Sequence, residues 1–191
     1  MAHKSGGDND IGRSLLELSR NVLNTYIKQK KMPEIDRSAF DKSLLTKKGC
    51  FVTLMKHGEL RGCIGHIMPQ ESLIDGVIEN TLNAALRDPR FPPVTADELD
   101  DIHMDISVLS VPAPLEFKNP EDLLSKLVPL KHGVILSKDG RQATYLPQVW
   151  EQLPDKVAFL ESLCRKAGLG RNDWKSPEIR IMVYEATVYY S

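Results

Sequence analysis

The sequence has few cysteines, no long apolar run and almost no net charge. Its three cysteines, Cys50, Cys63 and Cys164, are an odd number without regular spacing, which argues against a disulfide framework. A formal net charge of -1 provides no global field that would draw the chain to nucleic acid or to an anionic membrane. No stretch resembles a signal peptide or is long enough to span a bilayer. We therefore expect a cytoplasmic protein with free thiols and with neither nucleic acid nor a membrane as its partner.

Cofactor and metal motifs are also missing. The sequence contains no P-loop and no dinucleotide fingerprint, so it predicts no nucleotide cofactor. Cys63 and His66 are three residues apart, but this spacing on a strand sends the two side chains to opposite faces. No other pair of histidine, cysteine or carboxylate has a recognisable ligand spacing. The expectation is a protein without a metal site or a bound cofactor.

What the sequence does contain is the composition of an ordinary globular protein. Its 191 residues are 41% hydrophobic, which is enough for a sizeable core arranged as one compact unit or two subdomains. Apolar residues recur at helical or at alternating spacing along the chain. This pattern predicts helices over residues 10–32, 72–86, 120–127 and 156–167, and strands over 50–55, 60–66, 103–109, 134–137, 142–146 and 179–190.

Two pairs of these strands are predicted to form hairpins. Gly58 supplies the positive φ for a turn at His57-Gly58, and the dipeptide Asp139-Gly140 is a strong signal for a two-residue turn. In the first hairpin a two-residue loop would place Val52 opposite Cys63. Strand alternation would then put Arg61, Cys63 and Gly65 on one face and His66 on the other, so that His66 cannot serve as a base for Cys63.

The stretch Leu60-Arg61-Gly62-Cys63-Ile64-Gly65 stands out, because its arginine, thiol and glycines occupy a strand where Val and Ile would be ordinary. This stretch resembles the signature of the AMMECR-type domain family, whose prokaryotic members are called AmmeMemoRadiSam system protein A. The likeness extends in the family's order over nearly the whole chain, through Asp88-Pro89-Arg90-Phe91-Pro92-Pro93-Val94, Ile106-Ser107-Val108-Leu109, His132-Gly133-Val134, Leu146-Pro147-Gln148-Val149-Trp150 and Cys164-Arg165-Lys166-Ala167-Gly168-Leu169.

The resemblance implies an α/β fold of the α+β type, with a single domain over 8–191 that has two subdomains, each with an antiparallel sheet flanked by helices. The larger would comprise about 8–115 and 179–191, and the smaller about 116–178. A cleft would lie between them, with the signature stretch facing it. The bacterial family name implies a protein partner, either a dioxygenase-like protein or a radical enzyme of the same system. The resemblance carries no established activity with it.

For Cys63 the sequence leaves two interpretations open. Cys63 is either a nucleophile whose thiolate is favoured by Arg61, or a small apolar residue at a crowded junction. No base is identifiable by spacing, which favours the second interpretation. Arg61 is either paired with a structural carboxylate, with Asp105 or Asp88 as candidates, or is held out as a fork for an anion. Gly62 and Gly65 either allow another group to approach the backbone closely, as a ligand would, or allow the strand to bend.

Three further residues complete the candidate binding set. Arg90 follows Pro89 on a stiff arm and has the side chain to hold a phosphate, although the prolines favour a structural corner. Asp105 shares a strand face with His103 and Ser107, where a ladder of polar side chains is favoured over a converging triad. His132 would either brace the following hairpin or reach the cleft.

The sequence is therefore compatible with two functions. The first is a binding protein that holds a large substrate or a protein partner in the cleft, with Arg61, Gly62, Gly65, Arg90, Asp105 and His132 in contact with it. The second is an enzyme in which Cys63 acts as a nucleophile or thiol ligand and Arg61 anchors an anion.

Overall fold

The computed structural model describes residues 6–191 and divides the chain into two units, each of which is described by itself. The first unit runs to Leu109 and includes Thr187–Ser191. The second comprises Ser110–Ala186. Each unit contains a four-stranded antiparallel sheet and two α-helices, which confirms the predicted α/β fold class. No helix within residues 6–191 is long and apolar enough to cross a membrane.

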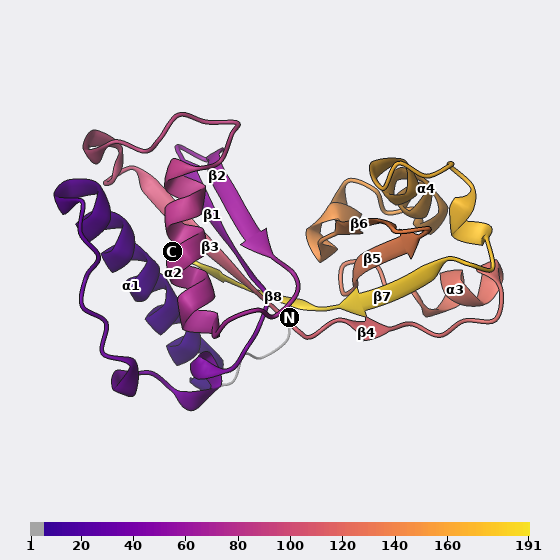
Figure 1. Cartoon of the computed structure of the whole chain (residues 1–191), viewed down its shortest axis with the longest axis horizontal. Helices are drawn as coiled ribbons and strands as arrows, with labels where there is room; N and C mark the ends of the chain where they lie inside the picture. Colours follow the sequence, from indigo (N-terminus) through magenta and orange to yellow (C-terminus); the bar gives the residue numbers. More distant parts are fainter. Residues whose placement is uncertain (1–5) are drawn as a thin grey trace. The chain divides into compact units, whose positions relative to one another are not determined.

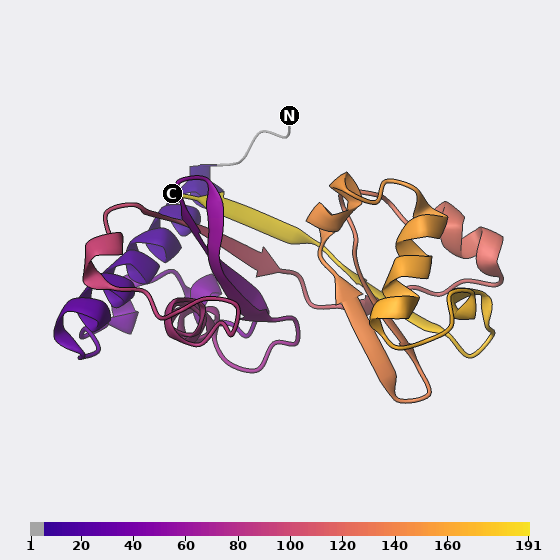
Figure 2. The ribbon, with the colours of Figure 1, turned by 90° about the horizontal axis from the view of Figure 1, so that it is seen from above.

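The first unit is a sheet with both of its helices on one face (Figures 1 and 2). Its strands have the order β2-β1-β3-β8. Their bounds are Cys50–Lys56 for β1, Glu59–His66 for β2, Ile102–Leu109 for β3 and Ala186–Tyr190 for β8. The helices are α1, Gly6–Gln29, and α2, Leu73–Leu86. The Ser72 side chain accepts a hydrogen bond from the Asp75 N–H and so caps α2, as its sequence predicts.

The core of the first unit lies between the helices and one face of the sheet. Val52 and Leu54 of β1 and Ile106 of β3 are fully buried there against apolar residues of α1 and α2. Because side chains alternate along a strand, Thr53 and Asp105 point to the opposite face. We call this second face the Thr53 face.

The second unit repeats this layout with other elements. Its strands have the order β4-β7-β5-β6, with β4 at Ala113–Pro114, β5 at Gly133–Lys138, β6 at Arg141–Tyr145 and β7 at Arg180–Tyr184. The helices α3, Pro120–Lys126, and α4, Lys156–Lys166, pack on the face that carries Val134 and Leu136. Trp150 lies in the short helix Pro147–Glu151 and stacks on Phe159 with ring centroids 3.6 Å apart.

Two predictions about the strands are wrong. The long strand predicted over 179–190 is divided at Glu185, so that β7 belongs to the second sheet and β8 to the first. Side chains alternate between the two faces in the same way in both segments, so the sequence pattern does not show the break. The break is visible only because the two segments pair with strands of different sheets. As a consequence, residues 110–115 and 179–186 belong to the second unit and not to the first.

The second error is the register of the β1–β2 hairpin. Lys56 pairs with Glu59, as expected for a two-residue turn, but the pairing shifts between Leu54 and Met55. Beyond this shift Cys63 stands opposite Thr53 and not Val52. Arg61 is the extra residue, so a β-bulge interrupts the alternation at that position.

Candidate functional site

The β-bulge separates Arg61 from Cys63. Arg61 donates from Nε and Nη2 to the two carboxylate oxygens of Glu98, each at 2.9 Å. Glu98 also accepts from Lys56 Nζ at 3.1 Å, and Lys56 follows Val52 and Leu54 on the helix-covered face by strand alternation. Arg61 therefore lies on that face, and the predicted shared face of Arg61 and Cys63 is wrong.

Arg61 is consequently held as a structural ion pair. Its side chain is 11% exposed and that of Glu98 is 13% exposed. The pKa of Glu98 is lowered, mainly by the hydrogen bonds from Arg61, against the opposing effect of burial. The carboxylate partner is thus Glu98, and neither Asp105 nor Asp88. The pattern Thr95-x-x-Glu98 predicts the capping box that forms here, but it does not identify Arg61 as the partner of Glu98.

Gly62 and Gly65 are needed for packing within the first unit. A Cβ atom at Gly62 would clash with the carbonyl oxygen of Ala84 in α2, and one at Gly65 would clash with the carbonyl oxygen of Cys50. These close approaches explain both glycines without a ligand.

Cys63 is clamped by the arm that follows α2. Its N–H donates to Oδ2 of Asp88 at 2.9 Å, and its carbonyl accepts from Nη2 of Arg90 at 3.4 Å. Arg90 also donates to both carboxylate oxygens of Asp88, from Nε at 2.9 Å and from Nη2 at 2.6 Å. Because β2 is at the edge of the sheet, Asp88 and Arg90 occupy the backbone groups that a further strand would use.

The clamp combines a buried carboxylate with an accessible cation. The Asp88 side chain is 2% exposed, whereas that of Arg90 is 53% exposed. The hydrogen bonds from Arg90 lower the pKa of Asp88, and Asp88 in turn raises the pKa of Arg90. Arg90, and not Arg61, is therefore the arginine beside Cys63.

A row of three side chains crosses the Thr53 face. Thr53 stands opposite both Cys63 on β2 and Asp105 on β3, and its hydroxyl Oγ1 donates to Sγ of Cys63 at 3.3 Å. Cys63 is partly exposed, whereas Cys50 and Cys164 are buried. Sequence analysis did not single out Thr53, because its position opposite Cys63 depends on the bulge.

Asp105 differs from the other carboxylates of this region. Burial raises its pKa, and nearby His103 opposes the shift. Within residues 10–191 the Asp105 carboxylate has no hydrogen-bond or ion-pair partner. Next to it on β3, Ser107 is almost completely buried. The row therefore ends in a carboxylate that is partly desolvated and unpaired.

The predicted histidine positions lie elsewhere. His66 is opposite Cys50 on the helix-covered face and contacts Glu71 through Nε2 at 3.2 Å, so the prediction that it cannot serve Cys63 is confirmed. His132 lies in the second unit and accepts at Nδ1 from the Val128 N–H at 3.2 Å. Burial lowers the pKa of His132. It braces the turn that precedes β5.

The side chains of residues 10–191 were also compared with the requirements of a metal site. Among the side chains of residues 10–191, no set of three or more histidine, cysteine, aspartate or glutamate residues is arranged to hold a metal ion. The chemistry available at Cys63 is hydrogen bonding by Thr53, a carboxylate at Asp105 and the positive charge of Arg90.

Comparison with known proteins identifies relatives over almost the full chain. The AMMECR1 family model matches residues 16–189. The chain is 36% identical over 189 residues to a protein of Methanothermobacter thermautotrophicus, covering 95% of this chain and 94% of the relative. It is 38% identical to protein MK0488 of Methanopyrus kandleri, covering 93% and 87%. Among solved structures, it resembles an uncharacterized protein, PH0010, of Pyrococcus horikoshii, with a TM-score of 0.84, 32% identity and coverage of 94% and 91%.

Proposed function

This chain belongs to the AMMECR1 family, and we propose that it is a binding protein that takes a large substrate or a segment of a protein partner onto the Thr53 face at Cys63. The bound group would contact Cys63, Thr53 and Asp105. Arg90 would contribute its accessible positive charge at the edge of β2.

The observation that carries this proposal is the clamp on Cys63. Burying the Asp88 carboxylate costs free energy that only good hydrogen bonds offset, and here those bonds hold the backbone of one partly exposed residue from both sides. A binding site gains affinity when its contact residues are held in place before the ligand arrives. The clamp supplies this preorganisation at Cys63.

The Asp105 carboxylate indicates which chemical group of the ligand would contact it. A partly desolvated carboxylate without a partner is satisfied by a hydrogen-bond donor or a cation. The bound segment would therefore present an N–H, O–H or ammonium group to Asp105. The resemblance to the AmmeMemoRadiSam proteins supports a dioxygenase-like or radical enzyme of the same system as the partner that provides this segment.

Site-directed crosslinking would test this proposal. Cys63 can be labelled selectively with a maleimide that carries a photoreactive group, because Cys50 and Cys164 are buried. Irradiation in a lysate of the source cells is expected to give a discrete product with the wild type, and much less product with Asp105→Lys.

The matched control moves the label to the other unit. In a Cys63→Ser, Lys118→Cys variant the same reagent would be attached to an exposed position of the second unit. This variant should not give the product. Equal crosslinking of the wild type, of Asp105→Lys and of the control would overturn the proposal.

Thiol chemistry at Cys63 is the second candidate function. The observation that favours it is the row Cys63, Thr53 and Asp105, in which burial has raised the pKa of the carboxylate and so made it a stronger base. The Thr53 hydroxyl, which donates to the Cys63 sulfur, would stabilise the thiolate, and Arg90 would anchor an anion in place of Arg61. Under this hypothesis Cys63 should react with iodoacetamide at neutral pH faster than a free model thiol. An equal or slower rate would exclude the activated nucleophile.

A further inference from the structure

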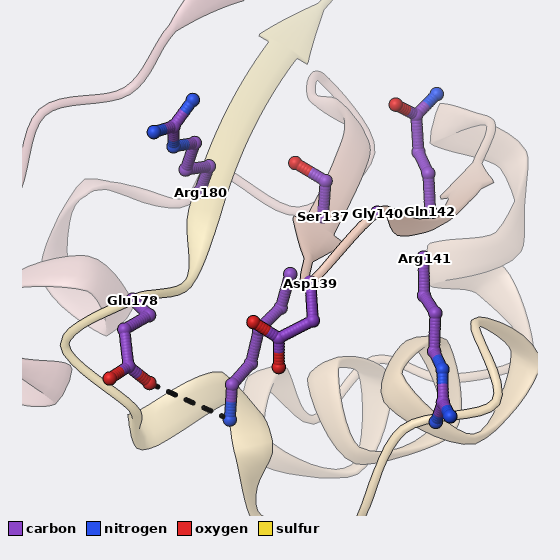
Figure 3. A pocket seen from close by; sticks show the side chains of 8 residues that line it. Ser137, Asp139, Gly140, Arg141, Gln142, Glu178 and Arg180 are labelled. Atoms are coloured by element: carbon purple, nitrogen blue, oxygen red, sulfur yellow. Dashed lines mark ion pairs between the residues drawn. The ribbon is translucent and has the colours of Figure 1, made fainter.

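A row of polar side chains also crosses the second sheet, far along the chain from Cys63. Ser137 on β5 stands opposite Arg180 on β7 and Gln142 on β6. The preceding residue, Leu136, packs in the core on the other face. Figure 3 shows Arg180, Ser137 and Gln142 extending to the same side, whereas Arg141 extends the opposite way. The row therefore points away from the core of the second unit.

Two hollows meet at this row, since Ser137 and Arg180 line both of them. The first has a volume of about 460 Å³ and is lined by polar residues of the β5–β6 hairpin. The second has a volume of about 580 Å³. Its lining combines polar groups with apolar side chains, among them Pro114, Leu115, Phe117, Pro177 and Met182. These volumes are in the range that small organic ligands occupy.

The three cations around the row differ in their partners, and Arg141 and Arg180 also differ in the side to which they extend (Figure 3). Lys138 is neutralised by Asp173, whose carboxylate lies 3.0 Å from Nζ, and by Glu178 at 3.9 Å. Arg141 donates a hydrogen bond to the Gly168 carbonyl. Arg180 is exposed and forms no ion pair with any side chain of residues 10–191.

Acidic residues limit where an anion can sit. Asp139 and Glu178 line the first hollow and Glu116 the second, and each would repel an anion placed beside it. In Figure 3 the Asp139 side chain extends away from Arg180. The part shared by the two hollows, next to Arg180 and Ser137, is therefore the favourable position for a negative group.

We propose that this part of the second unit binds a small organic anion in which one carboxylate, phosphate or sulfonate group is attached to an apolar body. The Arg180 guanidinium pairs with the anionic group, since its planar fork suits such oxygens. Ser137 donates a hydrogen bond from its hydroxyl, and the Gln142 amide donates another. The apolar body packs on Phe117 and Met182. This site lies in a different unit from Cys63 and does not depend on the function proposed above.

A fluorescence titration of the full chain with anilinonaphthalene sulfonate would test the site, because this probe joins a sulfonate to an apolar aromatic body. Removal of a charged hydrogen-bond partner typically weakens binding by about tenfold or more. Arg180→Gln is therefore expected to raise the dissociation constant by roughly tenfold. Arg165→Gln removes one charge from an exposed position of α4 outside the hollows and should change it by less than about twofold.

An uncharged probe separates the contribution of the charge from that of the apolar body. Phenylnaphthylamine lacks the sulfonate, so it should bind the wild type more weakly and should be unaffected by Arg180→Gln. Met182→Asp should weaken both probes. Equal affinity of the wild type and Arg180→Gln for the sulfonate would overturn the proposal, as would an equal loss with Arg165→Gln.

Discussion

The two β-hairpins of this chain share one turn type but differ in the strands that follow. His57 and Gly58 have φ values of 52° and 82°, and Asp139 and Gly140 have values of 50° and 73°, which is the pattern of a type I′ turn. The β5–β6 hairpin stays in register throughout. The β1–β2 hairpin shifts by one residue at Arg61.

The register shift determines the position of Arg61, and Arg180 of the second sheet provides a contrast to it. The bulge turns Arg61 to the helix-covered face, where Glu98 neutralises it. Arg180, on the regular second sheet, is exposed and has no ionic partner among the side chains that the structure describes. A single extra residue therefore makes Arg61 a structural arginine, whereas Arg180 lies on β7, outside both hairpins, and its side chain is exposed.

The largest expected effect comes from breaking the Arg61–Glu98 pair. Glu98→Leu would leave the Arg61 guanidinium almost buried without a counter-charge, and the free energy of unfolding should fall by about 3–4 kcal/mol. Replacement of both partners, as Arg61→Met with Glu98→Leu, should recover most of that loss. Urea unfolding of the single and double variants measures both values. A double variant no more stable than Glu98→Leu would contradict the ion-pair interpretation.

Removal of the clamp should have the next largest effect. Asp88→Ala leaves the Cys63 N–H without its acceptor, and we expect the free energy of unfolding to fall by about 2–3 kcal/mol. The loss is smaller than for Glu98 because Arg90 can turn to solvent. Asp173→Ala is the matched change in the second unit and should cost less, since Asp173 is more exposed than Asp88.

The clamp also makes a testable contribution to acid stability. The pKa of Asp88 is lowered in the folded state, so its contribution is complete above the ordinary carboxyl pKa of about 3.9 and is lost as pH falls through the lower folded value. Asp88→Ala should therefore flatten the fall in unfolding free energy below about pH 4. An unchanged pH profile would show that Asp88 is not held as a charged group.

A pair of glycine substitutions compares the two hairpins directly. Gly62→Ala should lower the free energy of unfolding by about 2 kcal/mol, because its Cβ would clash with the Ala84 carbonyl. A Cβ at Gly140 meets nothing within 4 Å. Gly140→Ala should therefore lower the free energy of unfolding only by the strain of alanine at a positive φ, roughly 1 kcal/mol. Thermal or urea unfolding of both variants provides the comparison. Equal losses would mean that α2 can move away from β2.

The smallest expected effect is a gain in stability. Burial raises the folded pKa of Asp105, so ionised Asp105 lowers stability above that pKa and does not do so when it is protonated. Asp105→Asn should therefore raise the free energy of unfolding at pH 7 by less than about 1 kcal/mol. The gain should disappear as pH falls below about 3.9. A loss of stability at pH 7 would reveal a structural partner for Asp105.

Local patterns in the sequence predicted most of the elements. Ser72 caps α2 and Pro120 begins α3, as expected from their side chains and backbone preferences. Both hairpin turns and the face of His66 were also predicted correctly. These features depend on residues within a few positions of one another, where propensity and alternation decide the outcome.

The candidate site was predicted only in part. Cys63 and Asp105 were both named as candidates, but their shared face depends on the register of β1 with β2 and β3, and Arg61 was assigned to the face of Cys63 wrongly. The true partner of Arg61, Glu98, is distant in sequence. No sequence motif indicated that Thr53 belongs to the site. Pairings of this kind depend on how strands and loops meet, which one sequence does not reveal.

The sequence by itself determined the helices, the turns and the alternation of each strand, because these follow from the chemistry of neighbouring residues. Only the tertiary structure decided the bulge at Arg61, the division of the last strand at Glu185 and the clamp of Asp88 and Arg90 on Cys63. Each of these depends on contacts between distant segments. The register of a strand and the partner of a charge are set by the whole packed unit, where burial and pairing are decided together.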